Sequence, residues 1–188
     1  MKSAVKISHL FMRDSMCIGD IVIDATAGNG HDTLFMAECV GTEGTVIAID
    51  KQEEAIQSTQ ALMLQHDIHN VNCMIADHAD LEILLQPFSH RVSCISFNLG
   101  YLPGSADRSI ITNAQSTIKA LHACLPLLNY RGALSVIAYR GHEHGPHEAQ
   151  AVDDWMRSLP TKEWHVSRIE AINQSAIAPI VYFAEKKY

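Results

Sequence analysis

The chain reads IVIDATAGNGHDT from residue 21 to residue 33. A β-branched run ends at Asp24, a turn with two glycines follows, and the next residues can begin a helix. Gly28 and Gly30 let the backbone turn tightly and approach a ligand, while a helix that starts here presents unpaired N–H groups. This order is typical of the first strand, turn and helix of a Rossmann-like sheet. A tight turn without a ligand has the same pattern, so the two glycines alone do not establish a binding site.

Short apolar runs alternate with amphipathic stretches along most of the chain, which predicts an α/β protein with helices on both faces of a mostly parallel sheet. Two β-rich runs near the end, Glu163–Ala171 and Ile177–Ala184, have only a short stretch between them. We therefore expect an antiparallel hairpin with a short turn at one edge of the sheet. The other predicted strands are Asp20–Asp24, Thr45–Asp50, Val71–Ala76, Val92–Phe97 and Ala133–Tyr139.

Apolar residues spaced three and four apart predict helices over Thr112–Leu128 and Lys51–His66, and a third helix that follows Val152 and ends at Pro160. Residues 1–18 precede the first strand. Within them, we expect Met1–Met16 to form a short lead-in helix that lies against the sheet or over the active site. The residues expected to face inward are Ile118, Leu121, Leu125 and Leu128 in the first of these helices and Ala55, Ile56, Thr59, Leu62 and Met63 in the second.

Length and composition indicate an ordinary globular chain with one domain, residues 1–188. Of the 188 residues, 47% are hydrophobic and 19% are charged, which is close to the average for folded proteins. The formal net charge of −7 should repel a polyanion, so it argues against a protein that coats nucleic acid but not against a local basic patch. The five cysteines include no CxxC pair, and no apolar run is long enough for a signal peptide or a membrane span. We therefore expect a cytoplasmic protein with reduced thiols and no membrane partner.

Three carboxylates, Asp24, Asp50 and Asp77, end three successive predicted strands. Since the carboxyl ends of parallel strands meet at one edge of a sheet, these side chains are expected to share a crevice there. Asp50 follows Gly30 by 20 residues, where a carboxylate can accept both hydroxyl groups of a ribose. The predicted cofactor-binding residues are Asp24, Ala25, Thr26, Gly28, Asn29, Gly30, His31, Asp32, Asp50, Lys51, Gln52, Asp77, His78 and Asn98.

The charge of this crevice distinguishes between two cofactors. NAD is one candidate, but its fingerprint has a third glycine where this chain has Thr33, and Asp24 would lie near a negative pyrophosphate. A cofactor with a positive centre and no phosphates fits the carboxylates better. S-adenosylmethionine has that chemistry, because its sulfonium and amino groups suit carboxylates, its ribose suits Asp50 and its adenine amino group can donate to Asp77. The predicted cofactor is therefore S-adenosylmethionine, with S-adenosylhomocysteine as its product.

The fourth predicted strand is followed by Asn98-Leu99-Gly100-Tyr101. Asn98 can accept a hydrogen bond through its amide oxygen, Gly100 allows close approach, and Tyr101 offers a flat face. These properties suit a planar substrate that presents a nitrogen to a methyl donor, although a plain Pro/Gly loop after a buried strand is the alternative. The predicted substrate-binding residues are Tyr101, Leu102, Pro103, Gly104, Arg108, Tyr139, Gly141, His142 and Glu143.

The stretch from Tyr139 to Glu148 holds three histidines within six residues. A metal site is disfavoured, since no carboxylate or thiolate stands at typical ligand spacing and methyl transfer needs no metal. We expect this loop to line the acceptor pocket, with His142 or Glu143 holding the substrate or accepting its proton; a solvated loop is the alternative. Asp32 is expected either to orient the substrate amine or simply to cap the helix that begins there. The predicted catalytic residues are Asn98, Tyr101, Asp32 and His142.

Five separate stretches occur in one order: DATAGNGHDT (24–33), FNLGYLPG (97–104), STI (116–118), YRGHEHG (139–145) and INQ (172–174). With them the chain resembles, from about Gly19 to Lys186, the small bacterial methyltransferase family labelled "putative rRNA methylases". The resemblance implies a Rossmann-like class I methyltransferase with a seven-stranded sheet and S-adenosylmethionine as donor. It also implies a tRNA anticodon stem-loop as partner, whose wobble 5-aminomethyl-2-thiouridine is N-methylated to 5-methylaminomethyl-2-thiouridine. Many amine methyltransferases carry Asn-Pro-Pro-Tyr after the fourth strand, where this chain has Leu99-Gly100 in place of the prolines.

Other functions stay open at this stage. A methyltransferase for rRNA or for a small-molecule amine is one alternative, and the acidic composition favours the small amine slightly. A nucleotide-binding module without catalysis would also carry a glycine-rich turn. We expect RNA recognition to come from the catalytic domain itself or from a second copy of it in a homodimer. Candidate phosphate contacts are Arg108, Lys119, Arg140, Lys186 and Lys187, although scattered cations are usually ordinary surface residues.

Overall fold

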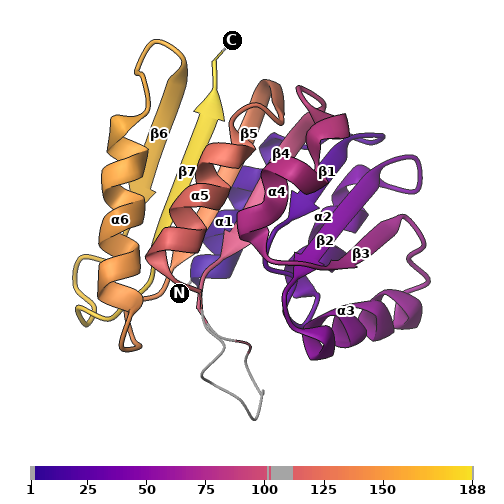
Figure 1. Ribbon diagram of the computed structural model, residues 1–188, viewed down its shortest axis with the longest axis horizontal. Coiled ribbons are helices and arrows are strands. Elements are labelled where there is room, and N and C mark those ends of the chain that lie inside the picture. Colours follow the sequence, from indigo (N-terminus) through magenta and orange to yellow (C-terminus); the bar gives the residue numbers. More distant parts are fainter. Residues whose placement is uncertain (1–2, 101, 103–111, 188) are drawn as a thin grey trace.

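The computed structural model describes residues 3–100, 102 and 112–187. These residues contain a seven-stranded sheet with the strand order β3-β2-β1-β4-β5-β7-β6 (Figure 1). The first five strands along the chain are parallel, while β7 runs antiparallel to both β5 and β6. The predicted fold class, including the antiparallel hairpin at the sheet edge, is therefore confirmed. The strands are β1 Ile21–Asp24, β2 Thr45–Asp50, β3 Val71–Ile75, β4 Val92–Asn98, β5 Leu128–Ala138, β6 Trp164–Ile169 and β7 Ile180–Lys186.

Helices cover both faces of the sheet, because successive residues of each strand point to opposite sides and both sides are apolar. In β1, Val22 packs in a cluster with Met12 and Met36 of the helices α1 and α2. The next residue, Ile23, packs in a cluster with Leu121 of α5 on the opposite face. Figure 1 shows α5 and α6 in front of the sheet and α1 behind it. The helices are α1 Ala4–Asp14, α2 His31–Val40, α3 Glu53–Gln65, α4 Leu81–Leu84, α5 Ala114–Cys124 and α6 Gly145–Ser158, with short 3₁₀ helices η1 His78–Asp80 and η2 Gln86–Phe88.

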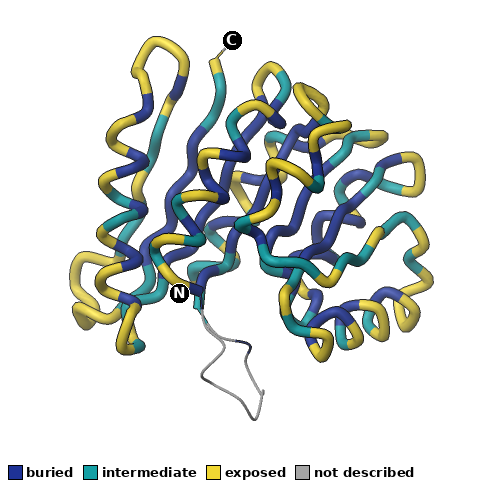
Figure 2. Tube along the Cα trace, in the orientation of Figure 1, coloured by how far each residue is buried: buried dark blue, intermediate teal, exposed yellow. Residues whose placement is uncertain are grey.

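The N-terminal helix α1 begins where Ser3 accepts a hydrogen bond from the backbone N–H of Lys6. It packs on β5 and β7 and also contacts α2. Figure 2 shows the strands as the buried interior of the molecule, with exposed positions mainly on the helices and loops. Within the described residues, no helix has the length and apolar character needed to cross a membrane.

Two predicted boundaries were wrong. Helix α5 ends at Cys124, and Leu128 belongs to β5 instead of the helical stripe. Pro126 explains the difference, because proline has no backbone N–H and cannot donate the next hydrogen bond of the helix. The connection between β6 and β7 spans residues 170–179 and is not a short turn. In α3, Leu62 is only partly buried, while the other four residues expected to face inward are buried.

Candidate active site

A cavity of about 580 Å³ opens at the carboxyl edge of the sheet. Its volume lies in the range of pockets that hold cofactors and small substrates. The walls come from α1, the β1–α2 turn, the ends of β2 and β4, and the residues after β5. The predicted site residues that line the cavity are Ala25, Thr26, Gly28, Asn29, His31, Asp32, Asp50, Lys51, Gln52, His78, Asn98, Leu102, Tyr139, Gly141 and His142.

Eight predicted site residues remain, of which the structure describes four. Tyr101, Pro103, Gly104 and Arg108 lie outside the described residues. Of those that are described, Asp24, Gly30, Asp77 and Glu143 are not among the lining residues.

The glycine turn is held by α3 and by Asp50. Gly28 and Gly30 have positive φ angles of 53° and 81°, a region that favours glycine. A Cβ on Gly30 would stand 2.9 Å from Thr59 Cα, so this position also needs glycine for close packing against α3. The backbone N–H of Gly28 donates to Asp50 Oδ2 at 3.0 Å, and Thr59 Oγ1 donates to the Gly28 carbonyl at 3.2 Å. The turn is therefore fixed in shape by side chains of two neighbouring elements.

Asp24 lies behind this wall and braces the turn, whereas the sequence placed it in the cofactor pocket. It is fully buried and accepts hydrogen bonds from the Thr26 backbone N–H at 3.2 Å and from Thr33 Oγ1 at 2.6 Å. Burial and the nearby charge of Asp32 raise the pKa of Asp24 to about 7. Both carboxylate oxygens are thus used within the protein.

At the third strand, His78 lines the cavity and its neighbour Asp77 does not. Asp77 Oδ1 accepts the Ala79 backbone N–H at 2.9 Å and so caps η1, which explains why the carboxylate turns away. His78 is buried, and its Nε2 atom has no hydrogen-bond partner in the described part of the chain. Burial lowers the pKa of His78, which favours the neutral ring. A buried polar atom without a partner is costly, so His78, a residue of the cavity wall, is a candidate to meet a hydrogen-bonding group of a cofactor.

Asn98 and Asp32 form the centre of the predicted acceptor side. The Asn98 backbone N–H donates to Thr26 Oγ1 at 2.7 Å, and its side-chain Nδ2 donates to Asp32 Oδ2 at 3.1 Å. Because a carboxylate only accepts, this contact assigns the amide nitrogen to the Asp32 side and leaves Oδ1 as the amide's acceptor. The N-cap of α2 is Gly30, so Asp32 is not the capping residue. Its other oxygen, Oδ1, lies 2.6 Å from Nε2 of His9, a residue of α1 that the sequence did not single out.

A second buried network anchors the chain on both sides of the segment after β4. Gly100, with a φ of 142°, donates its N–H to Thr112 Oγ1 at 2.9 Å, and its carbonyl accepts the Thr112 N–H at 3.0 Å. Glu148 of α6 is only 1% exposed and accepts from Thr112 Oγ1 at 2.8 Å and from Thr117 Oγ1 at 2.7 Å. Sequence reasoning missed Glu148, whose only local signal is an acidic residue in the first turn of a helix.

Beyond β5, Tyr139 and His142 face the cavity. Burial and the charge of Asp32 raise the pKa of Tyr139, so its hydroxyl stays protonated at neutral pH. Both ring nitrogens of His142 are buried and have no hydrogen-bond partner within the part of the chain that the structure describes. No group of three His, Cys, Asp or Glu side chains in residues 3–100, 102 and 112–187 is arranged to hold a metal ion.

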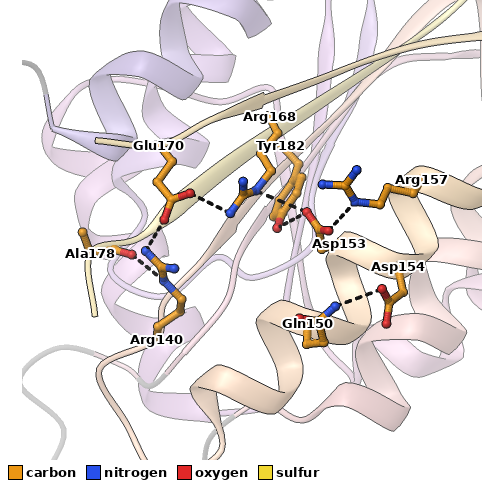
Figure 3. Close-up of polar contacts among 9 residues, drawn as sticks. All are labelled: Arg140, Gln150, Asp153, Asp154, Arg157, Arg168, Glu170, Ala178 and Tyr182. Carbon is orange, nitrogen blue, oxygen red and sulfur yellow. Dashed lines mark hydrogen bonds and ion pairs between the residues drawn. The ribbon is translucent and has the colours of Figure 1, made fainter. Parts of the chain in front are cut away.

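The predicted phosphate contacts are mostly engaged within the protein. Figure 3 shows Arg140 turned toward Glu170, at 2.7 Å, and toward the carbonyl of Ala178, at 2.8 Å. Arg168 joins Glu170 at 2.6 Å and Asp153 at 3.2 Å, so the cations at this edge are paired. Lys119 lies 3.5 Å from Asp80, Lys186 donates to the Leu128 carbonyl at 2.9 Å and Lys187 donates to the Thr161 carbonyl at 2.6 Å. Arg108 lies outside the described residues.

The sequence is similar to known methyltransferases along most of its length. The family profile described as "Putative rRNA methylase" matches residues 46–185. A profile for protein-L-isoaspartate(D-aspartate) O-methyltransferase matches residues 3–80. The chain is 35% identical to a protein of Arabidopsis thaliana named tRNA (mnm(5)s(2)U34)-methyltransferase, chloroplastic, in an alignment that covers 99% of this chain and 70% of that protein.

Solved structures agree with this result. A putative rRNA-methylase from Clostridium thermocellum has a TM-score of 0.93 and 33% identity, and the match covers 99% of this chain and 98% of the other. A putative methyltransferase from Streptococcus mutans, solved in complex with S-adenosylhomocysteine, has a TM-score of 0.86 and 30% identity over 99% of both chains. The predicted cofactor is thereby confirmed over NAD. The chain belongs to the family described as putative rRNA methylases and is an S-adenosylmethionine-dependent methyltransferase.

Proposed function

We propose that this methyltransferase methylates the aminomethyl nitrogen of 5-aminomethyl-2-thiouridine at the wobble position of tRNA, giving 5-methylaminomethyl-2-thiouridine. The relative from Arabidopsis thaliana carries this nucleoside in its name. The observation that carries the proposal is the Asn98 amide, which Asp32 orients at the wall of the cavity beside the glycine turn.

An amine acceptor needs this arrangement because it carries protons that must be held while its lone pair faces the methyl group. The oxygen of Asn98 can accept one N–H of the amine, and the neighbouring cavity wall keeps the nitrogen in place. Bound S-adenosylmethionine supplies an electrophilic methyl group on its sulfonium. Since methyl transfer is an in-line displacement, the main task of the protein is to hold acceptor and donor in contact, at about 3 Å.

For the donor, Asp50 is the carboxylate suited to the ribose hydroxyls, because it stands at the end of β2 and on the wall of the cavity. The neutral ring of His78 suits a hydrogen bond to the adenine base of the donor. On the acceptor side, neither ring nitrogen of His142 has a hydrogen-bond partner within the described residues. His142 is therefore suited to hold the substrate or accept its proton.

Nucleoside analysis of methylated tRNA tests the proposal. The protein is incubated with S-adenosylmethionine and with tRNA that carries 5-aminomethyl-2-thiouridine, and the digested nucleosides are examined by mass spectrometry. We expect this nucleoside to gain one methyl group, and tRNA with an unmodified wobble uridine to gain none. Absence of the gain together with methylation of a free primary amine would replace the proposal with a small-amine methyltransferase, which the net charge of −7 favours. The cytoplasmic location and the homodimer stay predictions.

A further inference from the structure

The N-terminal helix α1 supplies a side chain to the acceptor site. We propose that His9 is a positioning residue, which holds Asp32 so that Asp32 in turn holds the Asn98 amide. This inference rests on the proposed function, since it concerns the same acceptor nitrogen. The contacts form a chain of three side chains from three elements, with His9 Nε2 at 2.6 Å from Asp32 Oδ1 and Asn98 Nδ2 at 3.1 Å from Asp32 Oδ2.

The His9 ring has a fixed orientation. It stacks on the ring of Phe35, with the ring centres 3.8 Å apart and an angle of 2° between the planes. Phe35 belongs to α2, one turn beyond Asp32, so one helix supplies both the surface that orients the imidazole and the carboxylate that it meets. A ring held flat on Phe35 can direct Nε2 only within its own plane, which limits the positions that Asp32 Oδ1 can take.

The backbone of His9 is equally constrained. The neighbouring Ser8 is buried, and its Oγ lies 2.7 Å from Oγ of Ser135 in the middle of β5. Met12, one turn further along α1, is fully buried in the cluster between α1, α2 and the sheet. Val5, one turn earlier, lines the cavity. Helix α1 is therefore docked on the core of the sheet, and His9 reaches the site from a rigid element.

Asp32 needs such a partner because of its surroundings. Its side chain is 9% exposed, and the buried carboxylate of Asp24 is close enough that the charge of Asp32 raises the pKa of Asp24. A buried carboxylate that loses one of its donors is free to rotate toward another. Rotation of Asp32 would release Asn98 Nδ2 and allow the amide to turn, which would remove the oriented oxygen that the acceptor amine requires.

Two substitutions at His9 separate the effect of its hydrogen bond to Asp32 from the effect of its stacking on Phe35. In His9→Phe the ring can still stack on Phe35, but the donor is lost. In His9→Gln the side-chain amide can again donate to Asp32. The control is Leu10→Ala, since Leu10 is on the same helix and 48% exposed. The measurements are kcat for tRNA methylation, the Kd of S-adenosylmethionine by calorimetry, and the NMR resonances of the Asn98 side-chain amide.

We expect His9→Phe to lower kcat by about 10- to 100-fold while changing the donor Kd less than about threefold. The Asn98 amide resonances should shift in this variant, His9→Gln should restore most of both properties, and Leu10→Ala should match the wild type. Full activity of His9→Phe, unshifted Asn98 resonances, or a His9→Gln variant as poor as His9→Phe would overturn the inference. If the wild type methylates no tRNA, the proposed function fails, and the Asn98 resonances still decide whether His9 positions the amide.

Discussion

At the residue scale, the site depends on side chains that are oriented by other side chains. Asn98 shows this most directly, because Asp32 fixes which end of its amide is the acceptor. Asp24 shows it in a different way, because its carboxylate accepts hydrogen bonds from Thr26 and Thr33 and does not line the cavity. The function of each polar residue therefore follows from its partners and not from its chemical type.

Replacement of Asn98 by alanine should impair chemistry far more than donor binding. The variant loses the oxygen that we propose holds the acceptor amine, so we expect single-turnover methylation to slow by about 100-fold or more. The glycine turn and Asp50, which we propose hold the donor, remain in place, so the Kd of S-adenosylmethionine should change less than about threefold. Rapid-quench kinetics and calorimetry measure the two quantities. Equal losses in both would show that Asn98 serves the donor and not the acceptor.

Asp24 should make the stability of the protein depend on pH. Its pKa is raised from 3.8 to about 7, so the folded state binds a proton that the unfolded state releases between these values. Folding is then favoured at low pH, and this stabilisation is lost as pH rises from about 4 to about 7. The Asp24→Asn variant has no group that titrates at this position, so we expect its free energy of unfolding to rise relative to wild type by about 2 kcal/mol between pH 5 and pH 8.

Urea unfolding of both proteins at the two pH values measures this difference. The comparison between wild type and variant removes the contributions of all other residues, which the two proteins share. A difference that stays constant between pH 5 and pH 8 would rule out a raised pKa at Asp24.

At the scale of elements, the acceptor side is assembled by helices that lie far apart in the sequence. Helix α1 brings His9, α2 brings Asp32, and α6 brings Glu148, which ties Thr112 and Thr117 together. Thr112 is in turn hydrogen-bonded to Gly100 just after β4. Helix α6 thus helps to fix the position of Thr112, which is hydrogen-bonded to the end of β4 through Gly100.

Replacement of Glu148 by alanine should weaken this connection. The hydroxyl groups of Thr112 and Thr117 lose a buried acceptor, so we expect the free energy of unfolding to fall by about 1–3 kcal/mol. Methylation should fall as well, because Gly100 directly follows Asn98 and Leu99. The matched control is Gln150→Ala, at an exposed position of the same helix, with an expected change below about 0.5 kcal/mol. Urea unfolding measures both variants, and equal effects of the two substitutions would contradict a special role for Glu148.

At the scale of the whole molecule, the net charge of −7 coexists with a cavity built for a cationic cofactor. Carboxylates account for part of this charge near the site, since Asp32 and Asp50 line the cavity and Asp24 lies directly behind it. At the edge of the sheet formed by β7 and β6, Arg168 is paired with Asp153 and Glu170, and Arg140 is paired with Glu170. An RNA acceptor would therefore depend on recognition close to the cavity and not on a uniformly basic surface.

Binding of the donor should stabilise the fold as a whole. The cavity is walled in part by the ends of β2 and β4, and a ligand present at about 100 times its Kd stabilises the folded state by about 2.7 kcal/mol. For a chain of this length we expect the Tm to rise by roughly 5–10 °C. Differential scanning calorimetry with S-adenosylmethionine measures the shift. NAD at the same concentration is the control, and an equal or larger shift with NAD would contradict the assignment of the cavity.

The sequence by itself determined the strand order along the chain, the glycine turn and the apolar faces, because periodicity and backbone preferences are local properties. It also predicted that Asp50 and Asn98 reach one edge of the sheet, since the ends of parallel strands meet there. Boundaries near Pro126 were less predictable because an apolar stripe continued past the end of the helix. Only the tertiary structure decided that Asp24 and Asp77 turn away from the cavity, and that His9 meets Asp32 and Glu148 meets Thr112. The direction of a side chain at a strand end depends on which donors the neighbouring elements offer, and packing brings those donors together from distant parts of the chain.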